Sequence, residues 1–118
     1  MRVSNELRGR TKAFSSSIIH LFIALPKDRV EVAVIGKQLL RSATSVAAHT
    51  REASRARSDA EFCSKLDVLL QEADESSLWL EHLAEDCGIS ASKIDPIHQE
   101  CSELIAIFTT IVAKLRRG

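Results

Sequence analysis

Residues 58–88 read SDAEFCSKLDVLLQEADESSLWLEHLAEDCG and decide the fold. Ser58 is followed three residues later by Glu61, the spacing of a capping box, in which two free N–H groups at a helix start are satisfied reciprocally. Apolar residues then recur three and four positions apart as far as Cys87, and Gly88 is the expected left-handed stop. The stretch therefore predicts one helix over about residues 58–87, roughly 43 Å long at the α-helical rise.

Two segments before this stretch have the same periodicity. Residues 5–25 carry one apolar stripe that stops before Pro26, because the residue preceding a proline leaves the α region. Residues 28–54 carry a stripe of mostly small side chains, which allow a neighbouring helix to approach closely. We expect Asp28 to be the N-cap of this second helix. Gly36 lowers helix propensity and is expected to mark a close contact.

The last segment spans about residues 92–116. Ser92 and Asp95 are both candidate N-caps, and Pro96 is expected in the first turn, where its missing N–H has no cost. Four helices joined by connections of a few residues must pack as antiparallel neighbours. The sequence thus predicts an all-α protein of one domain, residues 1–118, folded as an up-down-up-down four-helix bundle.

The composition agrees with a folded helical domain. Of 118 residues, 45% are apolar, which argues against global disorder, and the scarcity of glycine, proline and aromatic residues disfavours a β-sandwich or barrel. Sixteen basic and sixteen acidic side chains leave a formal net charge of +0. This balance excludes a strong basic field over the whole chain, of the kind that drives non-specific binding to nucleic acids.

The chain carries no pattern of a membrane or secreted protein. The longest uncharged apolar-rich run, residues 13–25, is shorter than the ~20 residues that a membrane crossing needs. Three cysteines are an odd number without a close pair, so no disulfide framework is indicated. We therefore expect a cytoplasmic protein that makes no membrane contact.

The expected hairpin brings polar residues together. With the turn near residues 55–57, facing residues of the second and third helices sum to roughly 113, from the helical rise. Arg41 then falls near Glu72, and Glu52 falls near Glu61, where arginines of the turn are close enough to neutralise both acids. The resulting polar cluster consists of Arg41, Glu72, Arg51, Glu52, Glu61 and Lys65.

Two interpretations of this corner remain open. The pairs could fix the register of the hairpin and cap its helices. Alternatively, basic side chains of this region and of the C-terminus could receive an anion such as a nucleic-acid backbone. The candidate nucleic-acid-binding residues are Arg51, Arg55, Arg57, Lys65, Arg116 and Arg117.

Several strings of the sequence resemble those of a known bacterial family. They are QLLRSATSVAAHTREA (38–53), RARSDAEF (55–62), EADES (72–76) and ELIAIF (103–108). These strings resemble the bacterial four helix bundle protein family, also called the ribosomal RNA intervening-sequence protein family. The chain differs from the usual pattern in having Ala43 and Ala47 in place of glycine and His49-Thr50 in place of Asn-Tyr.

The resemblance implies a small cytoplasmic bacterial bundle that assembles into a ring-shaped homopentamer. A related branch, the accessory variability determinant of diversity-generating retroelements, is a basic pentamer that binds a reverse transcriptase and RNA. The resemblance supplies no catalytic residues.

The residues themselves offer little chemistry. His98 with Cys101, and His82 with Asp86, are two-ligand fragments, whereas a stable zinc site needs three or four ligands. No glycine-rich nucleophile elbow accompanies the serines, and the Glu-x-x-His pattern of di-iron bundles is absent. We expect no catalytic residue, metal or cofactor. Trp79 is expected to be a core or subunit-contact residue.

The leading hypothesis is a non-enzymatic homo-oligomer that acts as an assembly or adaptor protein for another macromolecule. Paired apolar residues make three stripes wide enough for a core and a second contact. These pairs are Leu21/Phe22, Leu69/Leu70 and Leu104/Ile105. The alternative is an accessory protein that binds RNA or DNA through the basic residues named above.

Overall fold

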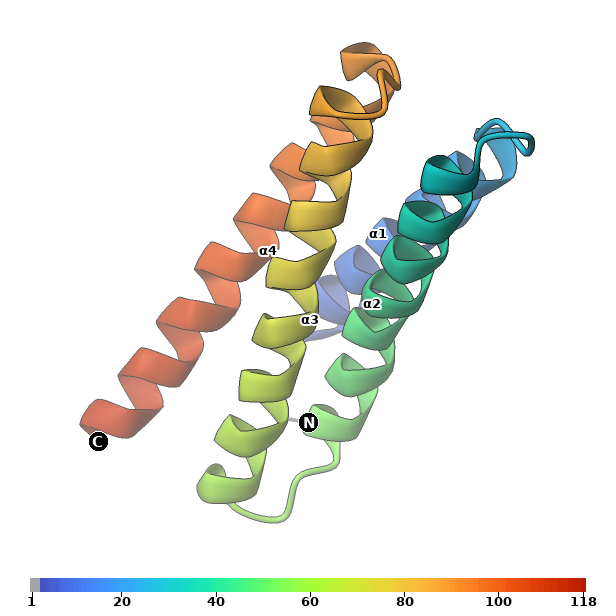
Figure 1. Ribbon diagram of the computed structural model, residues 1–118. Coiled ribbons are helices and arrows are strands. Elements are labelled where there is room, and N and C mark those ends of the chain that lie inside the picture. The colour runs from blue at the N-terminus through green and yellow to red at the C-terminus, as the bar shows by residue number, and fades with distance from the viewer. Residues whose placement is uncertain (1–2) are drawn as a thin grey trace.

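The computed structural model describes residues 3–118, and these form four helices with no strand among them. The helices are α1 (Asn5–Ala24), α2 (Val30–Ser54), α3 (Asp59–Glu85) and α4 (Ala91–Arg117) (Figure 1). All four predicted helices are confirmed, with ends within two residues of the expected positions. No helix of this part of the chain is long and apolar enough to cross a membrane.

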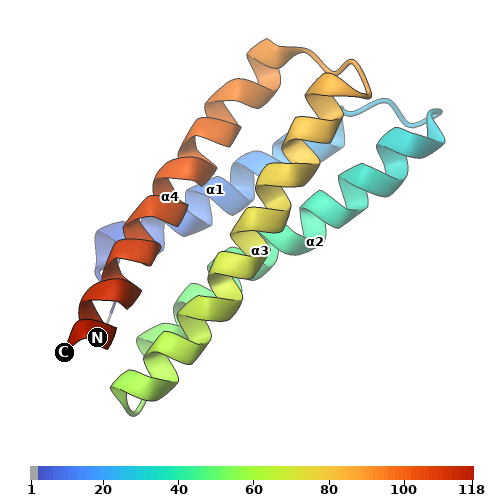
Figure 2. The same cartoon turned by 60° about the vertical axis from the view of Figure 1, so that its left-hand side comes forward.

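The helices form an antiparallel rod with extents of 48 × 21 × 21 Å. The α2–α3 turn and the described ends of the chain lie at one end of the rod, and the α1–α2 and α3–α4 connections lie at the other (Figures 1 and 2). Each helix packs against the next in the chain, and α1 also meets α4. The α2–α3 interface is the most extensive and the α1–α4 interface is the smallest.

The start of α3 confirms half of the predicted capping box. The Ser58 hydroxyl accepts a 3.0 Å hydrogen bond from the backbone N–H of Glu61. No reciprocal bond from the Glu61 carboxylate is present within residues 3–118. At the other end of α3, Gly88 adopts a φ of +71°, the left-handed conformation expected of a helix stop.

The predicted N-cap of α2 is wrong. The cap residue is Arg29, one position after Asp28, and its side chain makes no capping bond. The Arg29 guanidinium instead donates to the carbonyl of Cys87 at 2.8 Å and to Glu31 at 2.8 Å. Its side chain therefore ties the α1–α2 connection to the end of α3.

The start of α4 also differs from the prediction. The helix begins at Ala91 after the cap residue Ser90, so neither Ser92 nor Asp95 is the cap. Pro96 is consequently the sixth helical residue and not part of the first turn. The first turns of the helix bury Ile94, which is 2% exposed, and removing this side chain from water favours helix before Pro96.

A polar contact lies inside the α2–α3 interface. The hydroxyls of Ser42 and Ser76, both fully buried, are 2.8 Å apart. Each hydroxyl also has a carbonyl acceptor on its own helix, Leu39 at 3.3 Å for Ser42 and Glu72 at 2.8 Å for Ser76, so either serine can donate to the other. Small residues at this crossing let the two helices approach closely enough for the serines to meet.

Gly36 marks a close contact, as predicted. A Cβ at this position would lie 3.0 Å from Cδ1 of Leu25 and 3.4 Å from the ring of Phe22. The glycine therefore allows the end of α1 to lie close against α2.

The α1–α4 interface is closed by charges at the surface. Nε of Arg10 donates to Glu100 at 3.1 Å, and its Nη2 donates to Glu103 at 3.2 Å. The hydrogen bond to Glu100 is the main reason that the pKa of Arg10 is raised.

Candidate functional site

The polar cluster near the α2–α3 turn has the predicted register and different partners. The Arg41 guanidinium lies 3.2 Å from Glu72, as the hairpin register predicts. Glu52, however, is paired with Lys65 at 3.6 Å and with His49 at 3.7 Å. The arginines of the turn neutralise neither Glu52 nor Glu61, so this part of the expected cluster is not formed.

The unused arginines extend into solvent. Arg51, Arg55 and Arg57 are exposed, and none of them forms an ion pair with another residue of the described chain. Arg55 and Arg57 lie beyond the last residue of α2, in the turn itself, so they are not held against the helix faces that carry Glu52 and Glu61.

The neutral total charge conceals a strong polarity along the rod. Dividing each helix at its midpoint separates a basic half (residues 3–14, 43–71 and 105–118) from an acidic half (residues 15–42 and 72–104). The basic half carries ten lysines and arginines against five acids, a net charge of +5, and the acidic half carries five against eleven, a net charge of −6. The ten cations are Arg8, Arg10, Lys12, Arg51, Arg55, Arg57, Lys65, Lys114, Arg116 and Arg117.

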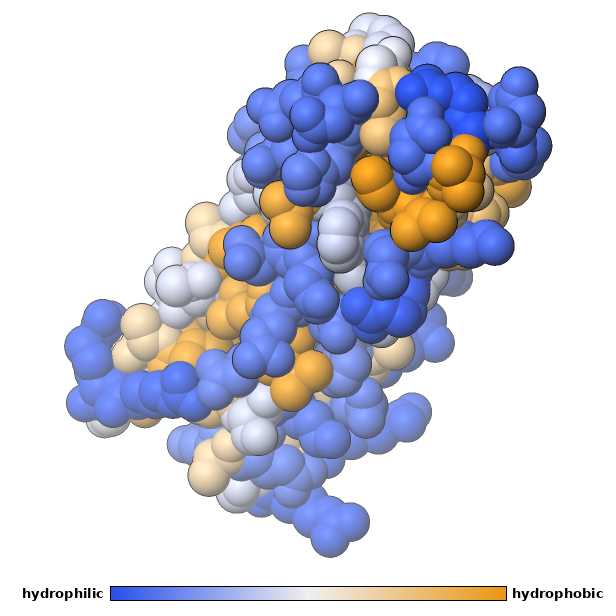
Figure 3. All heavy atoms as spheres, viewed as in Figure 1, coloured by the Kyte–Doolittle hydropathy of each residue, from blue (hydrophilic) through white to orange (hydrophobic). Residues whose placement is uncertain are grey.

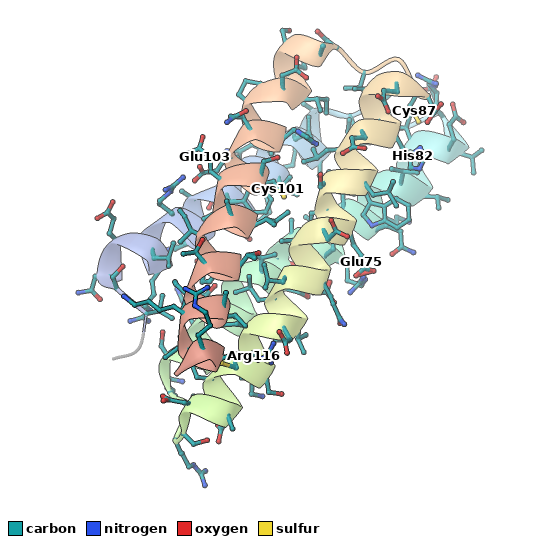
Figure 4. All side chains as sticks on the ribbon, turned by 90° about the vertical axis from the view of Figure 1, so that its left-hand side faces the viewer. Glu75, His82, Cys87, Cys101, Glu103 and Arg116 are labelled. Carbon is teal, nitrogen blue, oxygen red and sulfur yellow. The ribbon has the colours of Figure 1, made fainter. Side chains whose placement is uncertain are left out.

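All six candidate nucleic-acid-binding residues lie in the basic half, but they are not equally available. Lys65 is paired with Glu52. Arg116 binds Asp67 with a shortest contact of 2.6 Å, and this hydrogen bond raises the pKa of the guanidinium (Figure 4). Arg117, like Arg51, Arg55 and Arg57, is exposed and makes no ion pair with a described residue.

A second polar cluster joins α3 to α4 in the acidic half. Nε2 of His98 lies 2.9 Å from the Glu81 carboxylate and 3.0 Å from the Ser77 hydroxyl, and that hydroxyl donates to Glu81 at 3.1 Å. Hydrogen bonding from His98, then from Ser77, lowers the pKa of Glu81.

This cluster does not have the geometry of a catalytic triad. In a triad the serine and the acid bind opposite nitrogens of the imidazole, whereas Ser77 and Glu81 both contact Nε2 of His98. The sequence alone does not reveal this cluster, because its residues meet only through the register of α3 against α4. Its only sequence signal is the four-residue spacing of Ser77 and Glu81.

Neither of the two metal-ligand fragments is completed by further ligands in the described part of the chain. His98 binds Glu81, while Cys101 is buried and its Sγ lies 3.2 Å from the carbonyl of Ala73 (Figure 4). Nδ1 of His82 is 2.6 Å from Asp86, without a third ligand. Within residues 3–118, no group of three or more His, Cys, Asp or Glu side chains is placed to hold a metal ion.

Trp79 is half-buried and packs against the core. Its ring centroid lies 6.3 Å from that of His82. The indole Nε1 is buried and has no hydrogen-bond partner in the described part of the chain. Within one copy, the contribution of Trp79 is therefore the packing of its ring.

The exposed apolar residues are not the ones predicted. Phe22, Leu70 and Ile105 are half-buried against the core. The side chains that do reach solvent include Ile19 (40% exposed), Ile23 (65%), Val30 (75%), Val34 (55%) and Leu78 (44%). Apolar side chains gather at the surface over the start of α2, in the upper right of Figure 3.

Comparison with known proteins agrees with the fold. No curated protein matches the sequence significantly. Among solved structures, the chain is similar to a protein of unknown function from the S23 ribosomal protein family of Bacteroides thetaiotaomicron. The two share 33% sequence identity with a TM-score of 0.82, over 90% of this chain and 97% of that one. The model of the 23S rRNA-intervening sequence protein family matches residues 5–110. The resemblance seen in the sequence is therefore confirmed, and the chain belongs to the 23S rRNA-intervening sequence protein family.

Proposed function

We propose that the protein is a non-enzymatic, homo-oligomeric assembly protein of the cytoplasm. The observation that carries the proposal is the exposure of large aliphatic side chains at one end of the rod: Ile23, Val30 and Val34 are each more than half exposed. Burying such surface against a second copy removes it from water, at about 25 cal/mol per Å² of apolar area. Three free, buried thiols fit a reducing compartment.

The ring of five copies implied by the family resemblance is the specific form of this proposal. Light scattering of the purified protein at micromolar concentration tests it, with an expected mass of five times 13.0 kDa. A stable species of 13.0 kDa contradicts assembly, and another multiple contradicts only the number five.

A paired variant tests whether the exposed valines make the contact. Val30→Asp with Val34→Asp should shift the measured mass toward the monomer, because charged side chains would then have to be buried between copies. Thr109→Asp, an exposed position on α4 away from this surface, is the control and should leave the mass unchanged. An unchanged mass for the valine variant contradicts the use of this surface.

The second candidate function is binding of RNA or DNA, and the basic half of the rod favours it. Arg51, Arg55 and Arg57 project from one end without ion-pair partners in the described chain, which leaves them available to phosphates. The similar Bacteroides protein is assigned to a ribosomal protein family, and the family of this chain is named for 23S rRNA. These names make an RNA ligand the first one to test.

A gel-shift titration at two salt concentrations provides the test. Phosphate contacts release counterions, so the affinity should fall steeply as salt rises. Replacing Arg55 and Arg57 by alanine should weaken binding, whereas the same change at Lys27 and Lys93 in the acidic half should leave it unaltered. Absence of a shift at low salt contradicts the nucleic-acid hypothesis.

A further inference from the structure

Two outward-facing surfaces of the rod have complementary character. The first, here called the α1–α2 face, consists of Ile19, Ile23, Val30, Val34 and Lys37. Its isoleucines are four residues apart on α1, and its α2 members are spaced by four and three, so each set shares one side of its helix. A hollow of about 240 Å³ between the two helices is lined in part by Lys37.

The cation of the α1–α2 face is available for a partner. Lys37 is exposed and forms no ion pair with a described residue. Lys27, its basic neighbour at the hollow, is occupied instead: its Nζ donates to the carbonyls of Phe22 and Ile23 at 3.0 and 3.1 Å. Lys37 therefore presents an unneutralised charge beside exposed valines.

The second surface, the Leu78 stripe, lies on α3 and consists of Asp74, Leu78, Glu81 and Glu85. Spacings of four, three and four place these residues on one side of the helix. Leu78 is 44% exposed among three carboxylates, and a hollow of about 280 Å³ lies beside Asp74, Leu78 and Glu81. Glu81 is held by His98, but Asp74 and Glu85 make no ion pair with a described residue.

We infer that copies of this chain assemble by docking the α1–α2 face of one copy on the Leu78 stripe of the next. Apolar side chains then meet at the centre, and the free Lys37 of one copy meets the free carboxylates of Asp74 and Glu85. The inference rests on the proposed homo-oligomer and specifies which surfaces make it.

Charge also favours the pairing of unlike faces over the symmetric alternatives. Two α1–α2 faces both present the positive charge of Lys37 and two Leu78 stripes are both acidic, so neither symmetric pairing gains the charge attraction of the unlike pair. Pairing unlike faces produces a heterologous contact, which repeats from copy to copy and closes into a ring when the rotation between copies permits. A closed ring of this kind needs both faces on every copy, which this chain provides.

Charge reversal tests the pairing through the mass and the concentration dependence of assembly. Lys37→Glu alone, and Asp74→Lys with Glu85→Lys, should each weaken assembly about tenfold or more, because like charges then face each other. Combining all three changes in one chain should restore assembly, because the glutamate introduced at position 37 then faces the lysines introduced at positions 74 and 85. Lys93→Glu, an exposed reversal on α4 outside both faces, is the matched control.

The outcomes separate this inference from the proposed function. A monomeric wild type contradicts the homo-oligomer itself. An assembled wild type whose reversed variants assemble equally well, or whose combined variant is not restored, contradicts only the pairing of these faces. Thermal unfolding of each variant, followed by circular dichroism, shows whether a loss of assembly comes from a loss of folding.

Discussion

The α2–α3 and α1–α4 pairs are both antiparallel neighbours, yet they are held together differently. The α2–α3 pair is a hairpin in the sequence, with small side chains and the fully buried Ser42–Ser76 contact at its interface. The α1–α4 pair joins distant segments over the smallest interface of the bundle, bridged by Arg10 at the surface. Ion pairs such as Arg41–Glu72 and Lys65–Glu52 also bridge α2 and α3, but the hairpin has the larger interface, so salt-screened charges are a smaller share of its stability than of the stability of the α1–α4 contact.

The largest expected effect is the loss of stability when a leucine side chain is truncated to alanine, and its size should differ between two places in the bundle. Leu69 on α3 is fully buried, whereas Leu7 on α1 is 8% exposed and lines an open hollow beside Arg10 and Ile107. Leu69→Ala should lower the free energy of unfolding by about 3 kcal/mol or more, and Leu7→Ala by about 2 kcal/mol or less, because water can fill the space at Leu7. Urea unfolding at one protein concentration measures both, and equal losses contradict the comparison.

The next effect concerns the buried hydroxyls. Ser42→Ala and Ser76→Ala should each lower the free energy of unfolding by about 1 kcal/mol, because the remaining serine can still bond a carbonyl of its own helix. The double variant should lose less than the two single variants added together, because they share one hydrogen bond. Thr44→Ala is the control for removing a hydroxyl that does not bridge two helices, because the Thr44 hydroxyl bonds only carbonyls of α2. Additive losses at Ser42 and Ser76 would show that the helices are not coupled through this contact.

A smaller effect is expected at the α1–α4 contact. Arg10→Ala should reduce the free energy of unfolding by less than about 1 kcal/mol at low salt, because the pair is partly solvated. The loss should shrink further in about 1 M salt, where the screening length is only about 3 Å. Lys12→Ala, an exposed position without an ion pair in the described chain, is the control. A loss that does not change with salt would indicate that the aliphatic stem of Arg10 matters more than its charge.

The smallest effect is a pH dependence at the α3–α4 contact. Since hydrogen bonding lowers the pKa of Glu81 in the folded protein, its contribution to stability is present above the ordinary carboxyl pKa and is lost as pH falls through the folded value. Glu81→Gln should therefore flatten the decline of stability between about pH 5 and about pH 3. Asp95→Asn, which removes another exposed carboxylate, this one on α4, is the control for a general loss of negative charge. If wild type and Glu81→Gln lose stability identically as pH falls, Glu81 does not contribute to the pH dependence.

The contrast between the helix pairs also explains what the sequence could predict. The register of α2 against α3 follows from a short turn, and it correctly placed Arg41 beside Glu72. The contact of His98 with Glu81 was missed because two candidate N-caps, Ser92 and Asp95, left the start of α4 and therefore the α3–α4 register undefined. The predicted neutralisation of Glu52 by arginines of the turn failed because Lys65, one helix away, is its partner instead.

The exposed face was the hardest feature to predict. Periodicity identifies the apolar side of a helix, but it does not tell which margin of that side a neighbouring helix covers. Phe22 lies against Gly36 and is half-buried, while Ile23, the next residue, is 65% exposed. Which of these two side chains is covered depends on where α2 crosses α1, and the sequence of α1 alone does not determine that crossing point.

The reactivity of the three buried thiols can be used to measure local unfolding of the bundle. Cys63, Cys87 and Cys101 are unpaired and buried at different levels of the rod. Burial raises the pKa of the Cys101 thiol to about 12, so very little of the reactive thiolate exists at neutral pH in the native fold. An alkylating reagent can therefore react only when the helices separate. The order in which the three thiols are modified would show which part of the bundle opens most readily.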